Sequence, residues 1–100
     1  MKGPVHRILY TREAKKAIDG LDASVKKLIR NAVESLATEP EKGKPFSHGL
    51  AGLRSLRTSD YRIIYRLRGG GLIVLIVAVG HRRDVYKQLG ELLRRVEKSK

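Results

Sequence analysis

Hydrophobic and polar residues alternate along the second half of the chain in three short stretches, at about 53–58, 61–67 and 72–79. A period of two is typical of strands that bury one face. Ser59-Asp60 separates the first two stretches, and Gly69-Gly70-Gly71 separates the last two. Short connections made of turn-forming residues predict two hairpins, and therefore a three-stranded antiparallel meander.

The first half of the chain follows a helical period instead. Apolar residues recur every three or four positions over 14–21 and again over 25–36. Thr11 and Asp22 precede the two repeats, and either residue type can cap a helix. Glu39-Pro40 is predicted to end the second repeat, since a residue before proline disfavours helix. Two helices joined this closely predict an antiparallel helical hairpin.

The remaining segments complete the predicted order of elements. An apolar stretch at 5–10 predicts an N-terminal strand, 38–52 predicts a loop, and Asp84 can cap a last helix. The apolar residues on one face of that helix are Val85, Leu89, Leu92, Leu93 and Val96. The order β-α-α-β-β-β-α favours an α+β fold with the helices on one face of a mostly antiparallel sheet. The 100 residues fit a single domain, 1–100.

Charge narrows the range of partners. The chain carries 22 Lys and Arg against 10 Asp and Glu, a formal net charge of +12. Self-repulsion of this size favours a polyanionic partner, with nucleic acid first and an anionic membrane second. The longest apolar run, 72–79, is far shorter than the ~20 residues that span a bilayer, and the N-terminus has no apolar stretch of signal-peptide length. We therefore expect a cytoplasmic protein without a membrane partner.

Residue types exclude several chemistries. The chain has no cysteine, which excludes a disulfide, a thiolate metal site and a cysteine nucleophile. No two of the 10 carboxylates fall naturally on the open face of the predicted sheet, as the ligands of a two-metal nuclease would. We therefore expect no metal and no cofactor. The general route that remains for phosphate chemistry is attack by the 2′-hydroxyl of RNA on the adjacent phosphodiester.

Arginines interrupt the second strand of the meander at alternate positions. Because strand side chains alternate between faces, the odd-numbered residues of 61–67 are predicted to face the core. The even-numbered residues Arg62, Ile64 and Arg66 are then predicted to face the open side of the sheet.

Two turns bring further arginines toward Arg62. A two-residue turn at Ser59-Asp60 would set Arg57 directly opposite Arg62. A tight glycine turn would pair Arg62 with Ala78, so that Arg82 continues the same face just beyond the third strand. The three arginines are predicted to converge near one end of the open face.

Converging arginines favour a phosphate site over a merely solvated surface, although any one of them alone fits a solvated charge. Like charges opposite each other on a sheet are destabilising, and a guanidinium fork can grip two phosphate oxygens. Tyr86 lies close by in sequence and could stack on a base, donate to a phosphate or simply anchor the last helix. His81 has the opposite parity to Arg82 and should point away.

These residues resemble the RelE/ParE toxin superfamily of bacterial and archaeal toxin–antitoxin systems. The resemblance covers nearly the whole chain. It starts with a first strand ending near "YTREAKKAI" and continues through the helical hairpin to "EPEKGKPF". Its most specific part is "GLRSLRTSDYRIIYRL" followed by "VGHRRDVY".

The RelE branch of that superfamily implies a ribosome-dependent endoribonuclease that cuts messenger RNA in the decoding site without a metal. By matching motif positions, Arg62 and Arg82 would stabilise the phosphate and Tyr86 would stack on or orient the nucleotide. The resemblance also implies two partners besides RNA: the ribosome, and a RelB-like antitoxin with an acidic toxin-binding segment.

One departure concerns proton transfer. Some RelE-type enzymes carry lysines on the strand before Tyr-Arg, whereas here 53–57 offers Arg54 and Arg57. An arginine holds a phosphate well but keeps its proton. The general base therefore stays open among His81, Tyr86 and Lys44, and Arg66 is a further candidate for RNA binding.

Two other functions remain open. A ParE-like protein would inhibit DNA gyrase by binding, without nuclease chemistry. A simple nucleic-acid-binding module would need the charge but not the convergence. Only the nuclease needs Arg62 and "GHRRDVY" on one surface.

Overall fold

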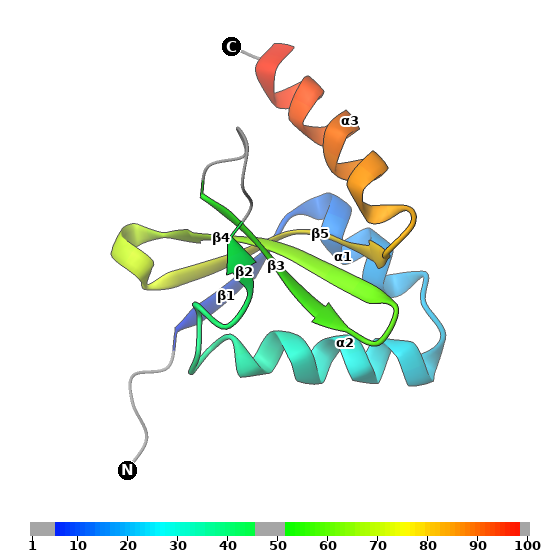
Figure 1. The fold of residues 1–100 in the computed structure, drawn as a ribbon, viewed down its shortest axis with the longest axis horizontal. Coiled ribbons are helices and arrows are strands. Elements are labelled where there is room, and N and C mark those ends of the chain that lie inside the picture. Colours follow the sequence, from blue (N-terminus) through cyan, green and yellow to red (C-terminus); the bar gives the residue numbers. More distant parts are fainter. Residues whose placement is uncertain (1–5, 46–51, 99–100) are drawn as a thin grey trace.

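A computed structural model describes the backbone of residues 6–45 and 52–98, and the side chains of these residues up to Glu91. The chain forms a sheet with helices on both sides (Figure 1). The elements are β1 (Arg7–Tyr10), α1 (Arg12–Asp19), α2 (Ala23–Ser35), β2 (Lys44–Pro45), β3 (Leu53–Thr58), β4 (Tyr61–Arg68), the 3-10 turn η1 (Gly69–Gly71), β5 (Ile73–His81) and α3 (Val85–Lys98). The predicted class and order are confirmed.

The sheet has five strands in the order β1-β5-β4-β3-β2. Strands β3, β4 and β5 form the predicted antiparallel meander. Strand β1 pairs with β5 in parallel, which is why Thr11, just after β1, can reach β5 and donate its hydroxyl to the Val77 carbonyl at 3.0 Å. The two-residue strand β2 pairs with β3. It lies inside the segment that was predicted as a loop.

Helices α1 and α2 cover one face of the sheet. Thr11 caps α1 as predicted, since its Oγ1 accepts from the Ala14 N–H at 3.1 Å. Asp22 is the N-cap residue of α2 but makes no side-chain capping bond. The helix ends at Ser35, before the predicted Glu39-Pro40, because the next N–H groups bond three residues back and tighten the last turn.

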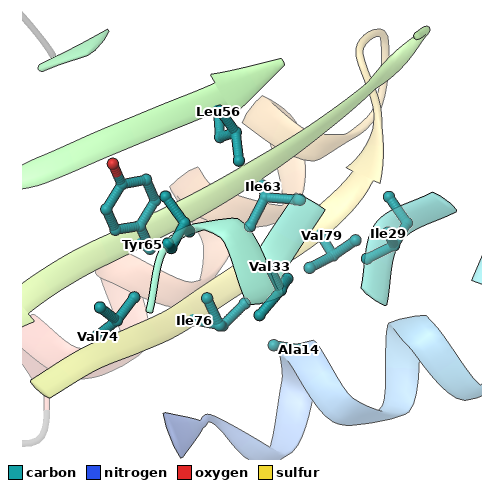
Figure 2. Close-up of a cluster of buried hydrophobic side chains, with 10 residues drawn as sticks. Ala14, Ile29, Val33, Leu56, Ile63, Tyr65, Val74, Ile76 and Val79 are labelled. Atoms are coloured by element: carbon teal, nitrogen blue, oxygen red, sulfur yellow. The ribbon is translucent and has the colours of Figure 1, made fainter. Parts of the chain in front are cut away.

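The main core lies between these helices and the sheet, as Figure 2 shows. Its buried side chains are Ala14, Ile29, Val33, Leu36, Leu56, Ile63, Tyr65, Val74, Ile76 and Val79. The odd-numbered side chains of β4 face this core, as predicted.

Helix α3 packs on the opposite face, so the prediction of all helices on one face does not hold for α3. Val85 and Leu89 contact a second cluster that includes Ile64, Val77 and Ala78. In Figure 1, α3 rises from the side of the sheet away from α2. Helix α3 covers Ile64, the apolar residue that lies between Arg62 and Arg66 on this face. Helix α3 therefore covers part of the face that was predicted to be open.

The β3–β4 register is as predicted, with Arg57 opposite Arg62. The β4–β5 register differs: Arg62 pairs with Gly80 instead of Ala78. The glycine connection runs to Leu72 before β5 begins, so it is longer than a tight turn. A bulge beside Ile64 and Tyr65 then shifts the pairing by one further residue.

Within the part of the chain that the structure describes, no helix has the length and apolar character needed to cross a membrane.

Candidate functional site

A basic pocket of about 430 Å³ opens where β2, β3, β4 and the first turn of α3 meet. Its lining residues are Lys42, Gly43, Lys44, Pro45, Ser55, Leu56, Arg57, Arg62 and Tyr86. Four of these side chains are cationic, and none of the described residues that line the pocket is a carboxylate. The arrangement concentrates positive charge in a concave site, which suits a phosphate group.

Strand register explains why these side chains share one surface. Arg57 of β3 stands opposite Arg62 of β4. Two residues along each strand, and on the same face, Ser55 stands opposite Ile64. Lys44 of β2, the strand on the other edge of β3, also stands opposite Ser55. Because Ile64 contacts α3, this whole face looks toward α3. The cations therefore gather beside Tyr86, whose side chain is 45% exposed at the start of α3.

The turn before β4 orients Arg62. Its Nη1 donates to the Tyr61 carbonyl at 3.1 Å and to the Ser59 carbonyl at 3.5 Å. Ser59 has a φ of 55°, a left-handed conformation that closes the two-residue turn. Both bonds use Nη1, so they leave the Nε–Nη2 edge of the guanidinium for a ligand.

Arg82 lies at the same end of the sheet but does not line the pocket. Its backbone N–H donates to the Asp60 carbonyl at 2.7 Å, and its Nε lies 3.9 Å from Oδ1 of Asp60. Both side chains are more than half exposed, so this ion pair is weak. The predicted convergence therefore holds for Arg57 and Arg62, with Arg82 beside the adjoining turn.

The other predicted residues lie elsewhere. His81 points to the α2 side as its parity predicted, with its ring edge-on to Tyr61 at a centroid distance of 5.7 Å. Its Nδ1 accepts from the Arg83 N–H at 3.2 Å. Arg66 is exposed on the far half of β4, and Arg54 has a structural contact described below. None of His81, Arg66 and Arg54 lines the pocket.

Sequence reasoning missed the contacts that hold the pocket wall in place, although Arg54 was a candidate for holding the phosphate. The Tyr65 hydroxyl accepts from the Gly43 N–H at 2.9 Å and donates to the Pro40 carbonyl at 2.8 Å. Arg54 donates to the carbonyls of Gly43 at 2.7 Å and Glu41 at 3.3 Å. We call these four bonds the 40–43 clasp. It fixes the segment that leads into β2.

The clasp requires a neutral tyrosine and a glycine. Burial raises the pKa of Tyr65, and this outweighs the lowering by the Gly43 N–H and by Arg54, so the hydroxyl remains a donor. A Cβ on Gly43 would lie 2.7 Å from the Tyr65 hydroxyl oxygen and 2.9 Å from the Ser55 carbonyl. Tyr65 was predicted only as a core residue. The signal was its hydroxyl, because a buried tyrosine usually finds a hydrogen-bond partner.

Comparison with known proteins identifies the class of this fold and site. Residues 8–86 match the family of the ParE toxin of the type II toxin–antitoxin system parDE. Toxin RelG of Mycobacterium tuberculosis is 31% identical over 85 residues, covering 83% of this chain and 98% of RelG. The protein is thus a toxin of the type II toxin–antitoxin class. Within that class, the chain belongs to the ParE toxin family of the RelE/ParE superfamily.

Solved structures agree. The toxin–antitoxin complex RelBE2 from M. tuberculosis contains a chain with a TM-score of 0.73 and 28% identity, covering 80% of this chain and 94% of that one. The intact E. coli RelBE toxin–antitoxin complex shares the fold, with a TM-score of 0.65 at 19% identity, covering 76% of this chain and 95% of that one.

Proposed function

We propose that this toxin is a ribosome-dependent endoribonuclease that cuts messenger RNA and so stops translation in the cytoplasm. The observation that carries the proposal is the basic pocket, which gathers Arg57, Arg62, Lys44 and Tyr86 on one concave surface. Positive charge suits the phosphodiester of RNA, and an aromatic ring can stack on the adjacent base. The net charge of +12 supports a nucleic-acid substrate bound to a larger RNA assembly.

The proposed chemistry uses the RNA as its own nucleophile. The 2′-hydroxyl oxygen bonds to the neighbouring phosphorus while the bond from phosphorus to the 5′-oxygen breaks. Arg57 and Arg62 hold the non-bridging oxygens, where negative charge builds in the transition state. Tyr86 orients the nucleotide from the rim, and Arg82 adds positive charge from the turn beside it.

Mapping the cut on programmed ribosomes tests the proposal. We expect incubation with the toxin to produce a single break in the codon that occupies the decoding site, with a 2′,3′-cyclic phosphate on one fragment and a 5′-hydroxyl on the other. Primer extension locates the break, and end-labelling identifies the termini. An intact messenger after prolonged incubation with folded toxin contradicts the proposal.

A second candidate function is inhibition of DNA gyrase by binding, without cleavage. The match of residues 8–86 to the ParE toxin family favours it. A gyrase inhibitor does not require Arg57 and Arg62 to converge on a phosphate, whereas the pocket has them in register. A supercoiling assay with purified gyrase separates the two candidates: inhibition of supercoiling together with an uncut messenger would support the second.

We also propose an acidic, RelB-like antitoxin as the partner that neutralises this toxin. The solved neighbours are toxin–antitoxin complexes, and the positive charge suits an acidic segment. A groove of about 470 Å³ lies between β1 and the two helices α1 and α2, where Leu9 and Tyr10 are 39% and 42% exposed. Strand β1 is also an edge of the sheet, and an extended segment can add to such an edge.

Coexpression tests the partner. We expect the product of the neighbouring open reading frame to restore growth to cells that express the toxin and to copurify with it at low salt. Leu9→Asp should weaken this complex, because it places a negative charge against the acidic segment in a groove that Lys15 and Arg30 also line. Growth arrest that persists with the neighbouring product, and no copurifying protein, contradicts the proposed partner.

A further inference from the structure

We infer that Lys44 is the general acid of this site, which protonates the 5′-oxygen as it leaves. The inference rests on the proposed nuclease function and assigns the proton-transfer role that the arginines of β3 cannot perform. Lys44 belongs to β2, outside the hairpin that carries the arginines.

Register places the Lys44 side chain on the same surface as the arginines. Lys44 stands directly opposite Ser55, and Ser55 shares its face with Arg57, two residues along β3. Lys44, Arg57 and Arg62 all line the basic pocket. Ser55 is small, so the long side chain from β2 can extend across it toward the phosphate position.

Proton chemistry selects Lys44 among the cations of the pocket. A guanidinium keeps its proton throughout the accessible pH range, so Arg57 and Arg62 can bind the phosphate but cannot donate. A lysine ammonium is a compact donor that can release a proton and recover it. Lys42 also lines the pocket, but it lies before β2 and has no strand partner. Lys44 is therefore the pocket lysine whose backbone is fixed by strand pairing.

The 40–43 clasp holds Lys44 in place. Tyr65 and Arg54 together bind both backbone groups of Gly43, the residue before Lys44. Tyr65 is a buried core residue and its hydroxyl bonds to Gly43 and Pro40, so the backbone that leads into β2 is fixed to the core. Tyr65 is a positioning residue in this account, whereas Lys44 contacts the substrate.

The proposed reaction needs no reactant other than water. The 2′-oxygen bonds to phosphorus and its proton passes to a water molecule. The bond from phosphorus to the 5′-oxygen breaks, its electron pair stays on that oxygen, and Nζ of Lys44 supplies the proton. The products are a 2′,3′-cyclic phosphate and a 5′-hydroxyl, and Lys44 regains a proton from solvent.

A leaving group that needs no proton tests this assignment. The probe is a ribosome-bound messenger whose scissile 5′-oxygen is replaced by sulfur, because a thiolate leaves well without protonation. On the oxygen substrate, Lys44→Ala and Lys44→Arg should both slow single-turnover cleavage by roughly 10²-fold or more, the usual contribution of general acid catalysis. On the sulfur substrate both variants should cut within about threefold of the unsubstituted toxin, since the lost step is no longer needed.

Controls separate this inference from the proposed function. Lys27→Ala, an exposed lysine of α2 outside the pocket, should cut both substrates at the rate of the unsubstituted toxin. Thermal melts should show that all three variants are folded, because Lys44 and Lys27 are exposed.

Three results would overturn the inference while the nuclease function stands. Lys44→Ala, or Lys44→Arg, could cleave the oxygen substrate at the rate of the unsubstituted toxin. Alternatively, Lys44→Ala could slow cleavage of the oxygen and sulfur substrates by the same factor. No cleavage by the unsubstituted toxin would instead refute the nuclease function and this inference together.

Discussion

Arg62→Ala is expected to slow single-turnover cleavage of a ribosome-bound messenger by roughly 10²–10³-fold, the usual loss for one preorganised transition-state donor. Arg62 lines the basic pocket and is oriented by the Ser59 and Tyr61 carbonyls. Its side chain is outside both hydrophobic clusters of the described residues, so the melting temperature should change little, as for most surface substitutions, which alter stability by within about 0.5 kcal/mol. Ribosome affinity should fall far less than the rate, because many other basic residues share the binding.

Arg68→Ala is the matched control. Arg68 is an exposed arginine of the same strand and the same parity as Arg62, but it lies at the glycine end, outside the pocket. It removes one unit of charge without touching the pocket and should leave the cleavage rate nearly unchanged. Equal cleavage rates for Arg62→Ala, Arg68→Ala and the unsubstituted toxin would rule out Arg62 as a transition-state donor, whereas an uncut messenger with the unsubstituted toxin would favour gyrase inhibition or simple binding.

Leu89→Ala is expected to destabilise the fold by about 2–5 kcal/mol, the usual cost of truncating a buried leucine. Leu89 is 2% exposed and lies in the cluster between α3 and the sheet, with Val85 and Ile64. The loss is large beside the ~5–15 kcal/mol that stabilises a typical domain. It should also impair cleavage, because α3 carries Tyr86 at the rim of the pocket.

Urea unfolding followed by circular dichroism measures the destabilisation. The control is Leu28→Ala in α2, since Leu28 is 38% exposed, and it should shift the midpoint only slightly. A Leu89→Ala midpoint equal to that of the unsubstituted toxin would mean that α3 is not docked on the sheet in solution. The role of Tyr86 in the pocket would then lose its support.

Local chemistry explains what could be predicted. The meander, the Thr11 cap and the Arg57–Arg62 pair all depend on residues close in sequence. A two-residue turn sets the register of its hairpin directly, so the core of the basic pocket could be located from the sequence together with strand parity.

The features that were missed depend on contacts between distant segments. The Tyr65 hydroxyl reaches 25 residues back to Pro40, and β2 becomes a strand because it pairs with β3. Periodicity identified the apolar face of α3 but could not say which side of the sheet it covers. The local sign that α3 covers this face was an isoleucine, Ile64, between two arginines, but it was predicted to be exposed.

The bulge in β5 has a consequence for comparing this chain with its relatives. Val74 and Ile76 face α1 and α2, Val77 and Ala78 both face α3, and Val79 faces the first pair of helices again. The strand thus changes phase by one residue at Val77. When a relative has a straight strand here, the one-residue gap in the alignment belongs at Val77, inside the strand. If the gap were placed in the glycine loop instead, each residue of this chain between the loop and Val77 would be aligned with a residue of the relative that faces the opposite side of the sheet.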